Sequence, residues 1–222
     1  MSQPPRASAP PKRARPKPAG PAAAPPENAG PKDAGAKPAG PKPAGAASRE
    51  PALRLVEVVD ADNRPVAGLP LEEVYRQRLP HRSVVALLFN GENKIYLQRR
   101  SSRKARLPGR WDVSARTRVR LGESALDAAA RALQDELRIQ TDRLRLVREL
   151  PPAPDSDPGF LSVFSMGRSP LAPDPNPDEV EEGFFYSADE LACLVREFRE
   201  LLTPGLVGLW QLGMPFPTLD HG

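Results

Sequence analysis

The residues best suited to chemistry lie in one segment rich in alanine and leucine, from Glu123 to Leu137. Charged side chains recur there at intervals of four residues: Glu123, Asp127, Arg131 and Asp135, with Glu136 beside the last of them. Residues four apart share one face of a helix. Carboxylates one turn apart can hold a hard divalent cation, which can bridge phosphate oxygens and activate water. The same spacing is also typical of a solvated face held by Glu–Arg pairs, so spacing alone leaves both interpretations open.

An apolar stripe predicts that this segment is a helix. Small and apolar residues recur at helical spacing: Leu126, Ala129, Ala130, Leu133 and Leu137. We therefore expect a helix over residues 123–137 that packs this stripe on the core.

Basic residues cluster on both sides of a short loop before this helix. The cluster comprises Arg99, Arg100, Arg103, Lys104, Arg106 and Arg110, followed by Arg116, Arg118 and Arg120. A basic rim facing an acidic helix suits a diphosphate held by charge-assisted hydrogen bonds. It equally suits phosphate binding without hydrolysis, or a solvated surface.

The helix resembles the signature of the Nudix proteins, G-x5-E-x7-R-E-U-x-E-E-x-G-U, where U is aliphatic. With the first acid placed on Glu123, the matching positions are Glu123, Arg131, Leu133, Asp135, Glu136 and Ile139. Upstream residues resemble the subgroup of isopentenyl-diphosphate isomerase and its uncharacterised hydrolase-like relatives: His81-Arg82, Gln98-Arg99-Arg100, Lys104, Pro108-Gly109 and Trp111. The resemblance covers about residues 53–212.

The resemblance implies an α/β fold, a Nudix-type α/β/α sandwich with a mixed sheet. It also implies a hydrolase that depends on Mg²⁺ or Mn²⁺ and acts on a nucleoside diphosphate-linked or related small-molecule diphosphate. Asp135 and Glu136 would be catalytic and hold the metal, and Glu123 would hold it too or brace Arg131, which is then structural. The expected substrate-binding residues are Arg99, Arg100, Lys104 and Arg118. A late acid could add to the metal site, or be a solvated loop charge: Asp155, Asp157, Glu179 or Glu182.

The chain departs from the signature at four positions. Thr117 replaces the first glycine, Ala132 the glutamate after the arginine, Asp135 a glutamate and Arg138 the late glycine. In the family the glutamate at position 132 usually binds metal, which an alanine cannot do. Ala132 therefore favours an alternative, a catalytically impaired module that binds a phosphorylated ligand or a protein. The retained polar signature positions favour the hydrolase.

Two further departures concern the isomerase. Its reactive cysteine would fall at Arg116 and a nearby histidine at Arg118, so isomerase activity is not expected. His81 matches an isomerase metal ligand, but a lone histidine is more often a polar residue at a strand edge. Cys193 is the only cysteine, so no disulfide can form within the chain, which predicts a reducing, cytoplasmic location. Cys193 itself is expected in the core.

The remaining elements are predicted from local pattern. A short helical turn is expected at 71–75, and Asn90-Gly91 predicts a hairpin turn. Ser187, with Glu190 three residues later, predicts a capped helix through Leu202. The other expected elements are strands at 53–59, 83–89, 94–98, 111–119, 144–150, 160–166 and 184–186, and a last helical piece at 206–212. Antiparallel strands with one inserted helix and terminal helices indicate the mixed-sheet sandwich.

The first 50 residues differ from the rest. They hold nine Lys or Arg, three Asp or Glu, 13 of the 29 prolines and no Trp, Tyr, Phe, Leu, Ile or Val. Such a stretch cannot bury enough apolar surface to fold. We therefore predict a disordered tail at 1–50, a Nudix domain at 51–215 and a C-terminal tail at 216–222. The basic tail is a solubilising spacer or makes weak nucleic-acid contacts, and no apolar run long enough to span a membrane is present.

Overall fold

The structure is a computed structural model that describes residues 55–152, 159–214 and 216. The predicted tail at 1–50, residues 217–222 and the candidate acids Asp155 and Asp157 lie outside the described residues. No helix among the described residues is long and apolar enough to cross a membrane.

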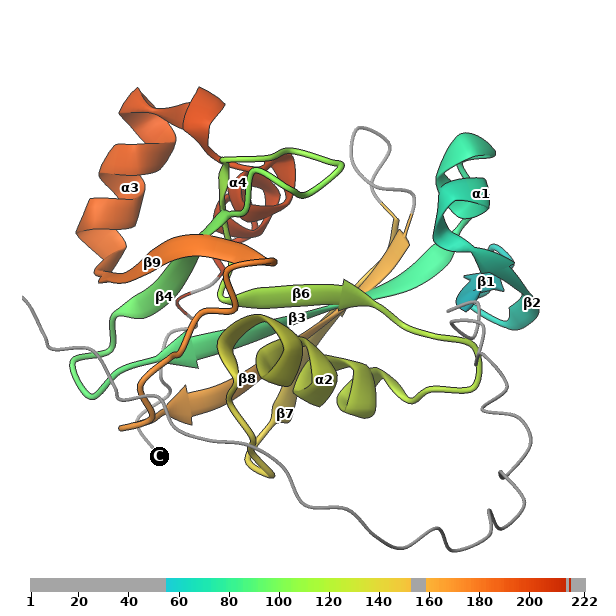
Figure 1. The fold of residues 1–222 in the computed structure, drawn as a ribbon, viewed down its shortest axis with the longest axis horizontal. Coiled ribbons are helices and arrows are strands. Elements are labelled where there is room, and N and C mark those ends of the chain that lie inside the picture. The colour runs from blue at the N-terminus through green and yellow to red at the C-terminus, as the bar shows by residue number, and fades with distance from the viewer. Residues whose placement is uncertain (1–54, 153–158, 215, 217–222) are drawn as a thin grey trace, which may run out of the picture. The chain divides into compact units, whose positions relative to one another are not determined.

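One mixed sheet runs through the described part of the chain (Figure 1). Its strands are β1 (Leu55–Val59), β2 (Pro65–Pro70), β3 (His81–Phe89), β4 (Ile95–Arg100), β5 (Trp111–Asp112), β6 (Ala115–Arg118), β7 (Arg145–Leu150), β8 (Gly159–Arg168) and β9 (Val180–Tyr186). Strand β3 pairs antiparallel with β1, β4 and β6 and parallel with β8. Strand β1 also pairs with β2, β8 with β7, and β4 with β5 and β9.

Helices cover both faces of this sheet (Figure 1). They are α1 (Leu71–Arg76), α2 (Ala125–Leu137), α3 (Ala188–Glu197), a short 3-10 turn η1 (Arg199–Leu201) and α4 (Pro204–Gln211). The central strand β3 shows how the two layers form, because its successive side chains point to opposite faces. Val84, Ala86 and Leu88 pack in one core cluster with α2, whereas Val85, Leu87 and Phe89 pack in a second cluster with α3 and α4. The predicted α/β/α sandwich is therefore confirmed.

The turn between β3 and β4 shows why the hairpin prediction is correct. Phe89 and Ile95 face each other across the two strands. The Asn90 side-chain oxygen accepts hydrogen bonds from the backbone N–H groups of Glu92 (3.0 Å) and Lys94 (2.9 Å). An asparagine that bonds the backbone ahead of it fixes a tight turn, and this turn sets the register of β4.

Helix α2 is capped at its start by Ser124, whose hydroxyl oxygen accepts the backbone N–H of Asp127 at 3.1 Å. The helix ends at Arg138, whose φ of 54° and ψ of 27° are left-handed. Glycine is favoured at such a position because it has no Cβ to clash. The late glycine of the signature corresponds to this backbone conformation, which Arg138 adopts with a full side chain.

Several local predictions were wrong. The prediction that Leu126 packs on the core was wrong, because it is 48% exposed and α2 instead turns Ala128, Ala129, Ala132, Leu133, Glu136 and Leu137 inwards. Cys193, predicted in the core, is exposed. The helix after Ser187 ends at Glu197 rather than Leu202, since the chain tightens into η1. Strand β2 was not predicted at all.

Candidate functional site

An ion pair between Glu123 and Arg131 braces the segment that leads into α2. Arg131 donates to both carboxylate oxygens of Glu123, from Nε at 2.7 Å and Nη2 at 2.8 Å. The backbone N–H of Arg120 adds a third bond to Glu123, at 2.9 Å. Arg131 also donates to the backbone oxygen of Arg118 (2.9 Å) and the hydroxyl of Thr117 (3.3 Å). The pair thereby ties strand β6, the following loop and α2 together.

The same contacts shift the pKa values of both groups. Burial raises the pKa of Glu123, but the hydrogen bonds from Arg131 and Arg120 outweigh it and leave that pKa below its usual value. The hydrogen bond to Glu123 raises the pKa of Arg131. Both oxygens of Glu123 are therefore ionised and engaged within the protein.

Glu136, the last signature acid, is buried between α2 and the sheet. Glu136 is 4% exposed, because it lies on the same inward face of α2 as Ala132 and Leu133. Its Oε2 accepts hydrogen bonds from Gln98 Nε2 (2.6 Å) and from the backbone N–H of Arg116 (3.2 Å). Its Oε1 lies 3.5 Å from the ammonium of Lys104. One carboxylate thus joins strand β4, strand β6 and the loop after β4.

Burial raises the pKa of the Glu136 carboxyl, and Lys104, Gln98 and the Arg116 backbone offset this only in part. Removal from solvent disfavours the charged form of a carboxyl group. A cation beside Glu136 would therefore stabilise a charge that water does not stabilise.

Asp135 lies on a different side of α2 from Glu136. Its side chain is 50% exposed and lies 3.8 Å from the Arg131 guanidinium. It lines a shallow polar pocket together with Gln134, Arg138, Asn176 and Glu179. Consecutive helical residues point about 100° apart, which explains why these two neighbouring acids do not face the same space.

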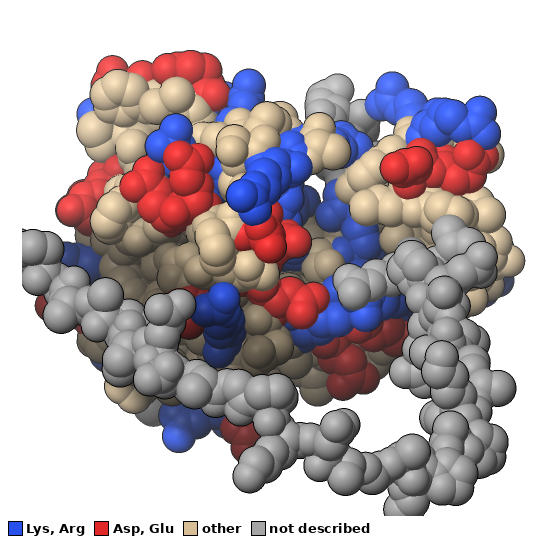
Figure 2. All heavy atoms as spheres, in the orientation of Figure 1, with Lys and Arg blue, Asp and Glu red and all other residues tan. Residues whose placement is uncertain are grey.

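A large cavity opens beside Glu136, with a volume of about 1030 Å³. Among the described residues that line it, the charged ones are Arg78, Arg100, Lys104, Arg106, Arg110, Arg116, Arg118, Arg199 and the single acid Asp112. In Figure 2, blue lysine and arginine atoms surround the hollow in the upper middle of the molecule. Its opposite wall is apolar and comes from α4 and from the paired ends of β7 and β8. A cavity with this charge suits an anionic ligand.

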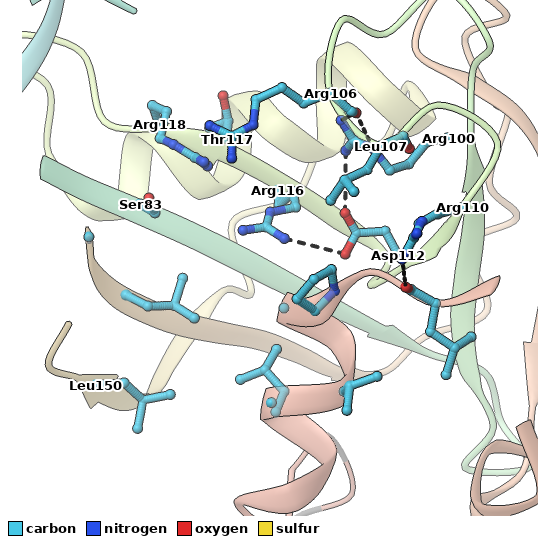
Figure 3. A pocket seen from close by; sticks show the side chains of 18 of the residues that line it. Ser83, Arg100, Arg106, Leu107, Arg110, Asp112, Arg116, Thr117, Arg118 and Leu150 are labelled. Atoms are coloured by element: carbon cyan, nitrogen blue, oxygen red, sulfur yellow. Dashed lines mark hydrogen bonds and ion pairs between the residues drawn. The ribbon is translucent and has the colours of Figure 1, made fainter. Parts of the chain in front are cut away.

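A buried aspartate organises two of these arginines (Figure 3). Asp112 is fully buried and lies 3.3 Å from Arg100 Nη1 and 3.5 Å from Arg116 Nη1. It also accepts a hydrogen bond from the hydroxyl of Thr203 at 2.8 Å, and Thr203 caps α4. A carboxylate that bonds two guanidinium groups fixes their orientation. The sequence did not point to Asp112, because no spacing distinguishes one aspartate in a short strand.

Two more arginines stack on an aromatic ring that also lines the cavity. The guanidinium carbon of Arg106 lies 4.1 Å from the centre of the Tyr75 ring, and that of Arg118 lies 5.4 Å from it. Such cation–π contacts hold flexible side chains in place. Nothing in the sequence pointed to this role for Tyr75, which lies in helix α1.

The structure brings together only part of the predicted site. Arg100, Lys104 and Arg118 line the cavity. Arg99 is not among its lining residues and pairs instead with Glu182 at 3.1 Å. In the described part of the chain, no three His, Cys, Asp or Glu side chains gather as a metal-binding group.

His81 does not lie at the edge of the sheet, so that prediction was wrong. Its ring is fully buried at the start of β3, which has β1 on one side and β8 on the other. Its Nδ1 lies 3.0 Å from the backbone oxygen of Leu79, and its ring meets Tyr75 edge-on at 6.0 Å between centroids. These contacts are typical of a structural histidine.

Comparisons with known proteins point to the family that the signature residues resemble. Residues 79–204 match the family model described as NUDIX domain. An uncharacterized Nudix hydrolase of Pseudomonas aeruginosa is 41% identical over 91 residues, which cover 41% of this chain and 54% of that protein. An isopentenyl-diphosphate delta-isomerase of Cereibacter sphaeroides is 31% identical over 156 residues, which cover 67% of this chain and 85% of that protein.

Solved structures show the same fold. The crystal structure of DR0079 from Deinococcus radiodurans has a TM-score of 0.63 and 25% identity, and covers 71% of this chain and 98% of its own. The MutT protein of Methanosarcina mazei has a TM-score of 0.50 and 21% identity, covering 60% of this chain and 91% of its own, and supports the fold alone. The chain spans about half the length of the uncharacterized Nudix hydrolases that it matches.

Proposed function

Because this chain belongs to the Nudix family, we propose that it is a hydrolase of a nucleoside diphosphate-linked or related small-molecule diphosphate, dependent on Mg²⁺ or Mn²⁺. The observation that carries the proposal is the position of Glu136. This signature acid is buried beside Lys104, and Lys104 also lines the basic cavity. A carboxylate and a phosphate-binding surface therefore adjoin.

The residues around Glu136 fit a hard divalent cation in their chemistry. Glu136 and Glu179 both contact the Lys104 ammonium, so a positive charge already lies between them. The Oε1 of Gln98, which is 1% exposed, has no hydrogen-bond partner among the described residues. Hard cations prefer such oxygens, and a bound cation would supply charge to phosphate oxygens and acidify a water molecule.

The proposed roles divide the signature residues. Glu136 would hold the metal, whereas Asp135 faces the shallow pocket on the exposed side of α2 and would add negative charge there rather than bind the same ion. Glu123 would brace Arg131, since both of its oxygens are already engaged. Arg100, Lys104 and Arg118 would bind the substrate phosphates through charge-assisted hydrogen bonds.

Isomerisation is not part of the proposal, although isomerases are among the relatives. The positions that match the isomerase cysteine and histidine hold Arg116 and Arg118, and both arginines line the cavity. An arginine remains protonated and cannot exchange a proton with a carbon atom at neutral pH.

One observation favours a second function, a module that binds a phosphorylated ligand without turnover. Ala132 is 1% exposed and packs in the core cluster of α2, so the signature carboxylate at this position is missing. The basic cavity would remain a binding surface in either case.

A substrate screen with two readouts separates the two functions. The full chain is incubated with nucleotide-linked and prenyl diphosphates in Mg²⁺ or Mn²⁺, and phosphate release and calorimetric binding are both measured. Metal-dependent turnover of at least one compound is expected. Binding without turnover, in folded protein, would replace the hydrolase with the binding module.

A further inference from the structure

The loop between β4 and β5 carries a lysine into the acidic site. Lys104 donates its backbone N–H to the oxygen of Ser101 at 3.1 Å, which turns the loop back on itself. The N–H of Ser101 donates to the backbone oxygen of Glu179, also at 3.1 Å. These bonds bring the loop and the segment before β9 together, so Lys104 and Glu179 are adjacent although they are distant in sequence.

The Lys104 ammonium lies between two carboxylates. It is 3.5 Å from Glu136 Oε1 and forms an ion pair with Glu179. The Lys104 side chain is 22% exposed, Glu136 is 6% exposed and Glu179 is 38% exposed. The ammonium is therefore held largely inside the protein, between one buried and one accessible acid.

The amide of Gln98, which bonds Glu136, has one oxygen without a hydrogen-bond partner in the described part of the chain. The amide nitrogen of Gln98 donates to Glu136, but its buried Oε1 has no partner among the described residues. Two carboxylates thus contact the ammonium, and the amide that bonds one of them keeps this unpaired oxygen. Hard divalent cations bind oxygens of these kinds, and the lysine now supplies the positive charge beside the carboxylates.

We propose that Lys104 is a built-in competitor for the metal, and that a divalent cation reaches Glu136 and Glu179 only when the ammonium withdraws. Two cations cannot share these oxygens at close range, because their mutual repulsion is strong where solvent is excluded. Lysine suits this role since its charge sits on a long, flexible stem. Lys104 also lines the basic cavity, so an anion bound there would attract the ammonium away from the two carboxylates.

The test measures the binding of Mn²⁺ alone, without substrate. Calorimetry and the electron paramagnetic resonance signal of free Mn²⁺ are the two readouts. Lys104→Met keeps an unbranched, mostly apolar side chain that is one atom shorter and removes the charge, so this variant should bind Mn²⁺ about tenfold more tightly than the wild type or better. The added Glu136→Gln change, in the double variant, should abolish the gain. Lys104→Gln serves as a second variant if Lys104→Met does not fold.

Arg103→Met is the matched control. Arg103 lies in the same loop, pairs with Asp178 and is 72% exposed, so this variant removes one positive charge without touching Glu136. It should leave Mn²⁺ affinity nearly unchanged. The proposal is overturned if Lys104→Met binds Mn²⁺ no more tightly than the wild type, or if Arg103→Met gains as much. The inference rests on the proposed function only in assuming that a divalent cation takes part, and binding without turnover would spare it.

Discussion

Glu123 and Glu136 are acids of one signature, yet the protein gives them opposite surroundings. Three N–H donors surround Glu123 and keep its pKa low, whereas burial dominates around Glu136 and raises its pKa. The first residue stabilises the loop before α2, and the second keeps a desolvated carboxylate near the cavity. The signature alone could not separate these roles, because it gives residue types and not their neighbours.

The stabilising role of Glu123 makes stability depend on pH. Glu123→Gln should lower the free energy of unfolding by about 2 kcal/mol at pH 7, the size of a lost charge-assisted bond. Because the folded pKa of Glu123 lies below its usual value of 4.5, its contribution is complete above that pH and is lost as the pH falls through the folded pKa. The measurement is chemical unfolding of both proteins between pH 3 and pH 7. Glu72→Gln, on the exposed face of α1, is the control, and a difference that does not shrink in acid would contradict the assignment.

The missing signature acid can be restored at Ala132. This residue is 1% exposed, so Ala132→Glu buries a carboxylate one turn before Glu136. We expect the free energy of unfolding in the presence of a metal chelator to fall by at least about 2 kcal/mol. Part of this stability should return on addition of Mn²⁺. Thermal melts with and without Mn²⁺ measure this. Ala132→Gln has the same size without the charge, and an equal response of both variants to Mn²⁺ would show that position 132 does not face the metal.

At the scale of elements, the pattern of helix α2 and the Asn90-Gly91 turn predicted most of the architecture. Their signals are local: a periodicity, a cap and a turn residue. The exposure of Leu126 and the early end of α3 could not be predicted from local pattern, because burial depends on which side of α2 faces the sheet and because the chain tightens into η1 after Glu197. Strand β2 was not predicted because its sequence pattern is weak, and its strand conformation depends on pairing with β1.

The end of α2 offers a test of backbone strain. Arg138→Gly should raise the free energy of unfolding by about 0.5–1 kcal/mol, because a left-handed conformation costs a side-chain-bearing residue energy that glycine avoids. The lost ion pair with Asp174 is largely exposed and offsets little of this gain. Arg138→Ala removes the same pair but keeps a Cβ, so it should show no gain in a denaturant titration. Equal stability of the two variants would argue against strain at this position.

At the scale of the whole molecule, the cavity was the least predictable feature. The sequence showed a basic cluster, but the cavity also takes Tyr75 from α1, Asp112 from β5 and Leu209 from α4. These residues come from distant parts of the chain and meet only through the sheet order. The basic cluster therefore predicted the charge of one wall of the cavity, whereas its other walls required the fold.

The basic N-terminal segment, residues 1–50, offers a test of the predicted domain boundary. Removal of residues 1–50 should leave the melting temperature of the domain unchanged, because that segment contains no Trp, Tyr, Phe, Leu, Ile or Val. Calorimetric melts of the full and shortened chains measure this. If the segment contacts nucleic acid, weak and salt-sensitive binding should disappear with it. A lower melting temperature after removal would contradict the predicted domain boundary.

We propose that hydrolysis by this Nudix domain depends on Glu136, and the turnover of Glu136→Gln tests this directly. The variant keeps the shape of the side chain and removes the charge beside Lys104. With the best substrate of the screen, at saturating Mg²⁺ or Mn²⁺ and with unchanged folding, kcat should fall by at least about 100-fold. A kcat within about threefold of the wild type would show that Glu136 neither holds a metal nor takes part in hydrolysis, and would contradict the account.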